Sequence, residues 1–468
     1  MTTPRLRTRT HHLLALALMH SLPALTLGQA CTTGFQPGGP GGTGIVDPFS
    51  AYVGPMADFQ SKLFVSGAFS GAGTLNTNVV AAFDPATSAW SALGGGVNLG
   101  NTNGFGAALA TYTIGGTPRL ILGGSFANVI NTGTGAVPDT TALAAWDGTR
   151  WSSLSTGFQP ATGRSVWTLL DWEQPPGVHR LVAGGGFAGI GAASAYGIAY
   201  FDGEGWNNFA GLSDAGIGGP FSPVAFASAV YNGQLYIGGR FSTVNGVAAA
   251  LVARWSGSAW QRPGALAAGG SISDVSALYV YNDGTGAKLY AGGYDMRVGG
   301  ASTSVASFDG IVWRAVGQNL GGRTTCLAAF NDGSGMKLYA GWTADAQQHY
   351  IYRLENNVWT TVDGGVSVAL TGNFPSVFGL HVTGNRLYVG GDFQIAGGEA
   401  AYGIAQYGPC ATPPCAPDFN NSGTLEAQDI FDFLSAWFAL DPRADFNHVG
   451  GFSAQDIFDF LSAWFAGC

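Results

Sequence analysis

Two segments near the C-terminus place oxygen-bearing side chains at intervals that suit a hard cation. They begin 27 residues apart, at Asp418 and Asp445. A Ca²⁺ ion takes about six to eight oxygen ligands, and a loop of about 12 residues supplies them from positions 1, 3, 5, 7 and 12 around a glycine at position 6. In the first segment these ligands are Asp418, Asn420, Ser422, the carbonyl of Thr424 and Asp429. In the second they are Asp445, Asn447, the carbonyl of Gly451 and Asp456.

The two segments are not equivalent as ligand sets. Gly423 and Gly450 both stand at the turn, but Val449 occupies position 5 of the second loop and has no side-chain oxygen. We therefore expect calcium in the first loop, and weaker binding or a bridging water in the second. Helix capping is the alternative, because Asp429 and Asp456 stand where helices begin and Asp is favoured there. The ordered repetition of the whole pattern favours calcium.

Each segment runs into the same helical sequence, Gln-Asp-Ile-Phe-Asp-Phe-Leu-Ser-Ala-Trp-Phe-Ala, at 428–439 and at 455–466. This duplicated loop and helix resembles a type I dockerin domain. The resemblance implies an EF-hand-like calcium domain that docks on a cohesin-like partner. It also implies that the partner is selected by Ala427, Gln428, Ala454 and Gln455.

Apolar residues fall at helical spacing in both copies, and most of them are predicted to form the core of this small domain. In the first copy they are Ile430, Phe433, Leu434, Trp437 and Phe438, and in the second Ile457, Phe460, Leu461, Trp464 and Phe465. Phe431, Phe458 and parts of the tryptophan rings are expected to stay exposed as a docking surface.

The rest of the chain shows no catalytic pattern, and we assign no catalytic residue. Polar candidates for a binding face are residues 98–103, Arg164, residues 171–173, Asp214, Arg240, Asp295, Arg297, Arg323, Asp345 and Asp392. A pair of carboxylates for glycoside chemistry must lie about 5 to 9 Å apart, which a sequence does not show. The histidines of this region, His179, His349 and His381, are isolated in the sequence. Asn-Asp-Gly-Thr-Gly at 282–286 and Asn-Asp-Gly-Ser-Gly at 331–335 resemble half a calcium loop, but turn formation explains them.

These candidates must be positioned by a repeated element. Arg386-Leu-Tyr-Val-Gly-Gly-Asp-Phe393 has relatives starting at 62, 119, 180, 234, 288 and 337, which are 49 to 61 residues apart. A period in this range indicates a stacked or radial repeat architecture.

Each repeat predicts four short strands joined by Asp-Gly type turns. In the fifth repeat the strands are expected at 277–281, 288–293, 305–308 and 313–316. A sheet of this size cannot bury both faces alone, so we predict a seven-bladed β-propeller. The glycine pair is expected to make room for the next blade, and the tryptophan of strand four to fill the space between blades. The Gly-Gly-Asp-Phe and Trp-Asp-Gly-x-x-Trp segments resemble those of secreted, kelch-like bacterial propellers.

The seventh repeat lacks its fourth strand. Thr33-Gly-Phe-Gln-Pro37 matches Thr156-Gly-Phe-Gln-Pro160 of the second repeat, so the N-terminal segment is expected to supply the missing strand. This closure would place Cys31 near Cys410. The dockerin resemblance implies a second pair between Cys415 and Cys468, whose chain ends lie together in that family. Connectivity itself does not follow from the sequence.

The N-terminus and the composition indicate an exported protein. Arg5, Arg7 and Arg9 precede an apolar run, and Gly28 and Ala30 are the small residues that a signal peptidase reads, so residues 1–30 are a predicted signal peptide. Removing them leaves 16 of the 19 basic residues against 28 acidic ones, a formal charge of −12. This charge argues against nucleic acid as a partner. No other run is long enough to predict a transmembrane segment.

We therefore expect a propeller at 31–409, a linker at 410–417 and a dockerin-like domain at 418–468. Three functions remain open. The first is a secreted, non-catalytic binding or scaffold propeller that binds a glycan or protein on one face and attaches through its tail to a cohesin-type partner or a cell surface. The second is a polysaccharide-degrading hydrolase or lyase delivered by the tail. The third is a self-associating structural surface protein.

Overall fold

The computed structural model describes residues 34–35, 44–46, 52–100, 104–154, 165–191, 193–209, 216–219, 222–343, 349–368, 375–408, 417, 419, 425–439, 441, 444, 446 and 453–466. Within these residues the fold is mainly β, with two α-helices at the C-terminal end. The signal peptide predicted at 1–30 and the four cysteines of the predicted disulfides, Cys31, Cys410, Cys415 and Cys468, lie outside the described residues. Cys326, which is described, is a free thiol.

The β-region contains seven units of four antiparallel strands, numbered here along the chain. Unit 1 consists of β3 (Tyr52–Phe59), β4 (Lys62–Ala68), β7 (Val80–Asp84) and β8 (Ala89–Ser91). Unit 2 consists of β10 (Phe105–Ile114), β11 (Thr117–Ser125), β14 (Leu143–Trp146) and β15 (Trp151–Ser152). Unit 3 consists of β16 (Ser165–Glu173), β17 (His179–Gly186), β20 (Ile198–Phe201) and β21 (Trp206–Asn207). Units 4 and 5 are β23 (Val224–Tyr231), β24 (Gln234–Arg240), β27 (Val252–Trp255) and β28 (Trp260–Gln261); and β30 (Asp274–Asn282), β31 (Ala287–Val298), β32 (Ala301–Phe308) and β33 (Trp313–Ala315). Units 6 and 7 are β34 (Arg323–Asn331), β35 (Met336–Thr343), β36 (Ile351–Glu355) and β37 (Val358–Thr361); and β39 (Ser376–Thr383), β40 (Arg386–Asp392), β43 (Ile404–Gly408) and β1 (Gly34–Phe35).

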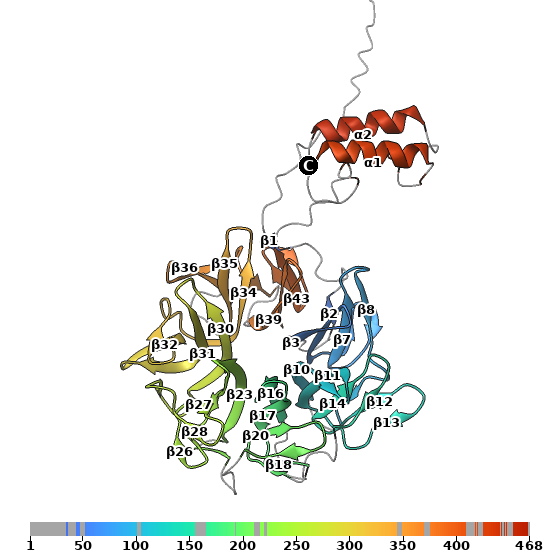
Figure 1. The fold of residues 1–468 in the computed structure, drawn as a ribbon. Coiled ribbons are helices and arrows are strands. Elements are labelled where there is room, and N and C mark those ends of the chain that lie inside the picture. Colours follow the sequence, from blue (N-terminus) through green and yellow to red (C-terminus); the bar gives the residue numbers. More distant parts are fainter. Residues whose placement is uncertain are drawn as a thin grey trace, which may run out of the picture.

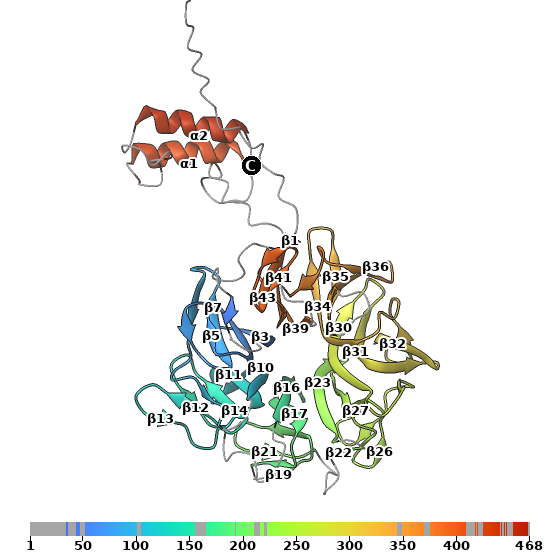
Figure 2. The ribbon, with the colours of Figure 1, turned by 180° about the vertical axis from the view of Figure 1, so that it is seen from behind.

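The units are arranged in a ring around a central hollow (Figures 1 and 2). The first strand of each unit lies innermost and contacts the first strand of the next unit, in the order β3, β10, β16, β23, β30, β34 and β39. β39 in turn contacts β3, so the last unit lies against the first. Units 6 and 7 also share one residue pair, Thr343 with Ser376, which joins them into a single eight-stranded sheet.

The outermost strand of unit 7 comes from the other end of the described chain. β1 pairs antiparallel with β43, with Gly34 opposite Gly408 and Phe35 opposite Tyr407. The Phe35 ring lies 5.2 Å from the Tyr407 ring, and its backbone N–H donates to Asp363 Oδ2 at 3.1 Å. The N-terminal segment thus supplies the fourth strand of unit 7, as the match between residues 33–37 and 156–160 predicts.

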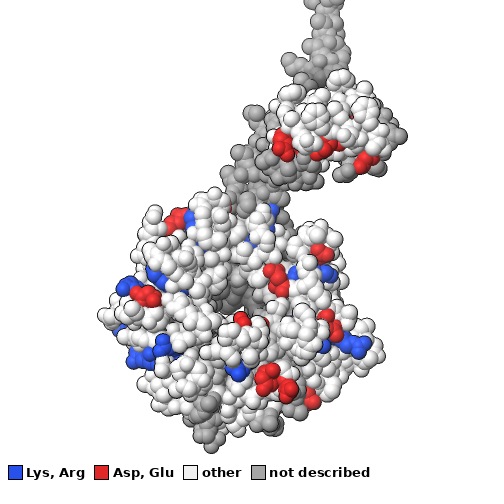
Figure 3. All heavy atoms as spheres, in the orientation of Figure 1, with Lys and Arg blue, Asp and Glu red and all other residues white. Residues whose placement is uncertain are grey.

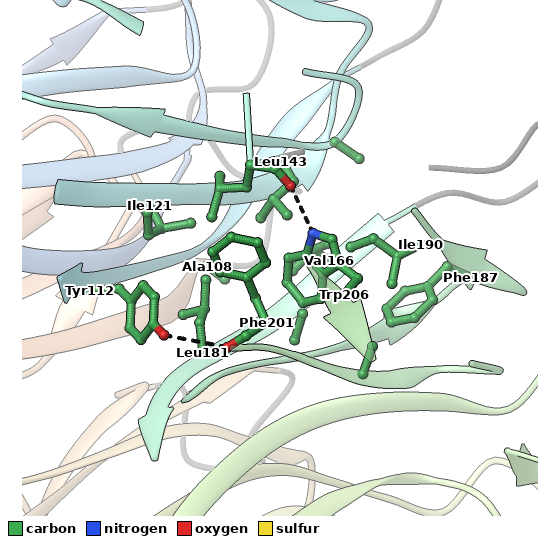
Figure 4. Packing of buried hydrophobic residues seen from close by; sticks show 14 of the residues in the cluster. Ala108, Tyr112, Ile121, Leu143, Val166, Leu181, Phe187, Ile190, Phe201 and Trp206 are labelled. Carbon is green, nitrogen blue, oxygen red and sulfur yellow. Dashed lines mark hydrogen bonds between the residues drawn. The ribbon is translucent and has the colours of Figure 1, made fainter. Parts of the chain in front are cut away.

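The hydrophobic core is divided among the seven contacts between neighbouring units. Each of seven clusters of buried side chains combines residues of two adjacent units, and one of them joins unit 1 to unit 7. Figure 4 shows the cluster between units 2 and 3, where Ala108 and Ile121 face Val166 and Phe201. A four-stranded unit therefore buries both faces only with a neighbour on each side.

In four of the units the tryptophan of the fourth strand joins the unit to the one before it, as the sequence predicts. The indole N–H of Trp206 donates to the carbonyl of Leu154 at 3.0 Å, a bond drawn in Figure 4. Trp151, Trp313 and Trp359 donate in the same way to Leu93, Pro263 and Val316. Each indole thus fills an apolar space and satisfies a buried carbonyl in one step.

Small strands form a further layer on the ring. The connection between the second and third strand of a unit forms a short hairpin in β5 (Gly71–Ala72) and β6 (Leu75–Asn76), β12 (Asn128–Asn131) and β13 (Gly135–Ala136), β18 (Gly189–Ile190) and β19 (Ala193–Ser194), β25 (Thr243–Val244) and β26 (Val247–Ala248), and β41 (Ile395–Ala396) and β42 (Glu399–Ala400). Strands that precede an innermost strand pair with such connections, namely β2 (Ile45–Val46), β9 (Val97–Asn98), β22 (Ile217–Gly218), β29 (Ala267–Ala268) and β38 (Val366–Ser367). The sequence did not predict this layer, because two-residue strands leave no periodic pattern.

The tail forms two helices, α1 (Ala427–Phe438) and α2 (Ala454–Ala466). The rings of Phe433 and Phe460 stack in parallel at 4.0 Å in its core. Within the described part of the chain, neither helix is long and apolar enough to span a membrane.

Candidate ligand-binding site

The ring encloses a central cavity of about 660 Å³, visible as the hollow in Figure 3. Every innermost strand contributes to its wall, from Tyr52 in β3 to Leu380 in β39. The volume falls within the range of about 300 to 1,000 Å³ that is usual for small-molecule sites. Charged side chains are sparse on the face of the ring that Figure 3 shows.

A β-bulge at the same place in every innermost strand turns one side chain toward this cavity. Unit 4 illustrates the bulge. Ala225 of β23 pairs with Gly239 of β24 and Ala227 pairs with Gly238, so Phe226 between them has no paired residue in β24. The corresponding residues of units 1, 2, 3, 5, 6 and 7 are Gly54 with Pro55, Ala107, Trp167, Ser276, Thr325 and Phe378. All of them line the cavity. Bulges of this kind re-aim side chains next to functional sites.

The second glycine of each repeated pair makes room for this bulge. A Cβ atom on Gly239 would lie 2.1 Å from the carbonyl oxygen of Val224 in the same unit, and five other units have a glycine here with the same contact. Unit 6 carries Trp342 instead. The first glycine has the role that the sequence predicts, because a Cβ on Gly238 would lie 2.5 Å from Val275 of the next unit. The expectation that both glycines face the neighbouring unit was therefore wrong for the second.

One arc of the cavity, contributed by units 7, 1, 2, 3 and 4, is aromatic. The rings of Tyr52 and Phe378 lie 5.1 Å apart. Trp167 lies 5.0 Å from Phe105 and makes an edge contact with Phe226 at 5.5 Å. Burial raises the pKa of Tyr52 to about 12, so its phenol stays neutral at physiological pH. This arc offers apolar ring faces and one hydroxyl.

The opposite arc, contributed by units 4 to 6, carries charge. Arg323 Nη2 lies 2.7 Å from Asp274 Oδ2, and Ser276 Oγ donates to Asp274 Oδ1 at 2.7 Å. The Asp274 side chain is 1 % exposed, whereas that of Arg323 is 39 % exposed and reaches the cavity. Burial raises the pKa of Asp274, although Arg323, the Ser276 hydroxyl and Arg240 each oppose the rise.

These groups lie at one mouth of the ring. Asp274 and Arg323 are the first residues of their innermost strands, and Arg240 pairs with Val224, which is the first residue of β23. Asp392 pairs in the same way with Ser376. Because all units share one strand order, the beginnings of the innermost strands face the same side. Burial also raises the pKa of Asp392.

The sequence candidates divide into three groups. Arg240 and Arg323 line the cavity, and Asp392 lies at the same mouth. Asp171 pairs with His179, and Asp295 lies 4.0 Å from Arg297. None of these four residues lines the cavity. Arg164, Asp214, Asp345 and residues 101–103 lie outside the described residues. The sequence reasoning missed Asp274, whose only signal was its place two residues before the bulge in the fifth repeat.

Among the described residues that line the cavity, Ser276, Thr325 and Cys326 are of the types that act as nucleophiles in enzymes. Burial raises the pKa of the Cys326 thiol to about 12, so it stays protonated at neutral pH. No histidine is among the described residues of the lining. His179 and His381 instead pair at 3.0 Å with Asp171 and Asp58.

The two Asn-Asp-Gly segments act as turns. Asp332 accepts hydrogen bonds from the backbone and hydroxyl of Ser334, from Lys337 and from the Tyr339 hydroxyl. Asp283 of the preceding unit bonds Thr285, Lys288 and Tyr290 in the same pattern. These carboxylates stabilise hairpins within the ring.

In the tail, the structure describes two of the nine predicted calcium ligands. Asp429 and Asp456 are fully buried, and each accepts a hydrogen bond from the backbone N–H three residues earlier, of Glu426 at 2.9 Å and of Ser453 at 2.8 Å. Both therefore help to cap their helices from within the first turn, but they are buried, whereas the alternative interpretation expects solvated N-cap residues. The ligands predicted at Asp418, Asn420, Ser422, Thr424, Asp445, Asn447 and Gly451 lie outside the described residues. Calcium binding stays a prediction.

The two helices of the tail make reciprocal contacts. The Trp437 indole donates to the carbonyl of Ser453 at 3.3 Å, and the Trp464 indole donates to the carbonyl of Glu426 at 3.3 Å. Each indole thus reaches the beginning of the other helix. The two copies are related by an approximate two-fold axis in these contacts.

The predicted partner residues are exposed at the beginnings of the helices. They are Ala427, Gln428, Ala454 and Gln455. Eight of the ten apolar residues at helical spacing lie in or against the core, whereas Phe438 and Phe465 are 75 % and 77 % exposed. They stand seven residues after Phe431 and Phe458, which are also exposed. At two turns of spacing they share a helix face with these residues rather than with the core.

Comparisons with known proteins give structural similarity only. No protein-family profile matches the chain, and no curated protein matches it. The extracellular domain of a one-component system from B. thetaiotaomicron matches with a TM-score of 0.47 and 13% identity over 80% of this chain. An ancestral GH74 enzyme matches with a TM-score of 0.45 and 11% identity over 81%. The computationally designed protein Ika8 matches with a TM-score of 0.40 and 12% identity over 76% of this chain and 83% of its own.

The chain spans 39% of the length of the B. thetaiotaomicron domain and 51% of that of the GH74 enzyme. At these identities and TM-scores the similarities assign no activity to this chain.

Proposed function

We propose that this chain is a secreted, non-catalytic ligand-binding protein. A seven-bladed β-propeller at 31–409 binds its ligand in the central cavity, a linker follows at 410–417, and a dockerin-like calcium domain at 418–468 attaches the propeller to a cohesin-type partner or a cell surface. Export is supported by the signal-peptide pattern of residues 1–30. The proposal has a binding half and an attachment half, which can be tested separately.

The propeller is supported by the repetition of one strand order in seven units, by seven cores between neighbouring units and by the contact of β39 with β3. A ring closed by the pairing of β1 with β43 leaves no unit with an uncovered face. Propellers are closed in this way because radial repetition leaves only short edges.

The binding half rests on one observation, the convergence of the bulges of all seven units on a single cavity. Bulges cost regular ladder hydrogen bonds, so their presence at one level in all seven units favours a use for the side chains that they expose. Those of units 3, 4 and 7 are aromatic, whereas Ser276 and Thr325 of units 5 and 6 carry hydroxyls and lie on the side of the cavity where Arg323 pairs with Asp274. If the inner wall served only to pack the units together, it would not need these aromatic and polar side chains.

The attachment half is supported by the two loop and helix copies and by the exposure of Ala427, Gln428, Ala454 and Gln455. Binding to immobilised type I cohesin domains, with and without a chelator, tests it. We expect capture in calcium and loss of capture in chelator, and a double substitution of Gln428 and Gln455 by Glu should weaken it. Capture that ignores both the chelator and the substitutions would contradict this half.

A polysaccharide-degrading enzyme is the second candidate. Asp274 and Asp392 lie at one mouth, and burial raises the pKa of both. A raised carboxyl pKa is a property of general acids. Release of reducing ends or unsaturated products from a panel of polysaccharides, lost in Asp274→Asn and Asp392→Asn, would replace the binding proposal by an enzymatic one.

A further inference from the structure

We infer that the central cavity recognises an organic anion in which a carboxylate is attached to a ring, and that Arg240 is the residue that binds the carboxylate. This inference deepens the binding half of the proposed function and rests on it. It follows from the charge balance of the cavity, from the free donors of Arg240 and from the aromatic arc beside it.

The cavity has an excess of positive charge in an acidic protein. The chain carries a formal charge of −9, yet the charged side chains of the described lining are Arg240 and Arg323. Arg323 is neutralised by Asp274 at 2.7 Å. In the described part of the chain no carboxylate lies within 4.0 Å of the Arg240 guanidinium. A local cation of this kind attracts an anionic ligand against the field of the whole molecule.

Arg240 is held in place but keeps donors free. Its Nη2 donates to the carbonyl of Ser222 at 3.5 Å, and its guanidinium lies 5.8 Å from the centre of the Phe226 ring. Its Nε is buried and has no hydrogen-bond partner among the described residues. Arg323 Nε has the same status. The Arg240 side chain lines the cavity, and a planar guanidinium matches a carboxylate with two parallel hydrogen bonds.

The neighbouring side chains favour a ligand with a flat face. Phe226 joins Arg240 to the aromatic arc, because its ring contacts Trp167 at 5.5 Å. Aromatic side chains pack on apolar ring faces, which an inorganic anion does not have. A cavity of about 660 Å³ also exceeds what a small inorganic anion fills. A ligand with a carboxylate on a ring can place the ring against the aromatic arc and the carboxylate against Arg240.

Such a ring has two chemical sources, a sugar acid or an aromatic acid, and calorimetry on the full chain distinguishes them. Galacturonic acid is compared with galactose, and 4-hydroxybenzoic acid with phenol. We expect one acid to bind at least about tenfold more tightly than its neutral counterpart, with an affinity that falls as salt rises. Sodium sulfate serves as the anion without a ring and is expected to bind at least about tenfold more weakly than that acid.

Variants locate the contact. Arg240→Gln should weaken binding of the preferred acid about tenfold or more, and Arg240→Lys should restore part of it, because a lysine keeps the charge but not the paired hydrogen bonds. Arg314→Gln is the matched control, since Arg314 pairs with Asp309 on the exposed surface and does not line the cavity. Thermal unfolding of each variant shows whether the ring is intact.

The outcomes separate the inference from the proposed function. Equal binding of acid and neutral counterpart overturns the anion, and leaves a cavity that binds rings. Equal binding of sulfate overturns the ring. Unchanged affinity in a folded Arg240→Gln variant overturns the role of Arg240. If none of these probes binds, the inference is wrong, while a glycan screen still tests the binding half of the proposed function.

Discussion

The seven units of the ring differ at the residue that the bulge turns inward, whereas the two helices of the tail repeat the same twelve residues at 428–439 and 455–466. In the ring, the positions in the cores between units are similar from unit to unit, whereas the bulged positions, which face the cavity, vary in size and polarity. In the tail, the contacts are reciprocal, as in the two indole hydrogen bonds, so a change in one copy breaks a pair. The ring can therefore build an asymmetric site from a symmetric frame, and the tail presents the same surface twice.

The closing strand of the ring should show the largest effect. Phe35→Ala removes a buried ring from the pairing of β1 with Tyr407, and we expect a loss of about 3 to 5 kcal/mol in the free energy of unfolding of the ring. Denaturant titration followed by tryptophan fluorescence measures it. Ile311→Ala, at an 80 % exposed residue of the same ring, should change it by less than about 0.5 kcal/mol. Equal effects would show that β1 does not close the ring.

The core of the tail should respond independently of the ring. Phe433→Ala removes the stack with Phe460, and a loss of about 3 to 5 kcal/mol should unfold the tail. Circular dichroism at the helix bands reports the loss, and the unfolding transition of the ring should stay in place. Phe438→Ala is the matched control, because this residue is exposed. A shift of the ring transition in Phe433→Ala would contradict the separation of the two regions.

Calcium should distinguish the two regions next. At a concentration about 100 times its Kd, a bound ion stabilises the folded state by about 2.7 kcal/mol. We expect a chelator to lower the melting temperature of the tail and not that of the ring, in differential scanning calorimetry of the full chain. Asp418→Ala should remove the part of the response that comes from the first loop. A tail that melts at the same temperature with and without calcium would count against the metal.

Acid should affect the ring through Asp332. Burial alone raises the pKa of this carboxyl, but hydrogen bonds from Ser334, Lys337 and Tyr339 outweigh burial and lower it to about 2. Since the folded pKa lies below the unfolded value of about 3.9, the stabilisation is present above pH 4 and lost as the pH falls through about 2. The loss should amount to about 2 kcal/mol.

Asp332→Asn tests this origin, because the variant should show a flatter dependence of ring unfolding on pH between about 4 and 2. Asp84→Asn is a suitable control, since Asp84 bonds only backbone N–H groups of its own turn in the described structure. An unchanged slope in Asp332→Asn would assign the acid sensitivity to other carboxylates.

Much of the frame could be predicted from the sequence. The strands of the fifth repeat, predicted at 277–281, 288–293, 305–308 and 313–316, lie within or within one residue of β30 to β33. The indole contacts between units also follow the prediction. The candidate site was predicted in part, because Arg240 and Arg323 were named and Asp274 was not. Bulges carry no sequence pattern of their own, so the residue that leaves the alternation looks like any other strand residue.

The sequence by itself determined the number of units, the strand order within each and the duplication in the tail, because these depend on local turns and on the period of apolar residues. Only the tertiary structure decided which side chains meet, since Arg240, Asp274 and Arg323 come from three consecutive units and lie together because the innermost strands of these units pack side by side. The same holds for Phe438, which has helical spacing for the core but faces outward. Periodicity fixes a residue's place along an element, whereas packing between elements fixes which faces are covered.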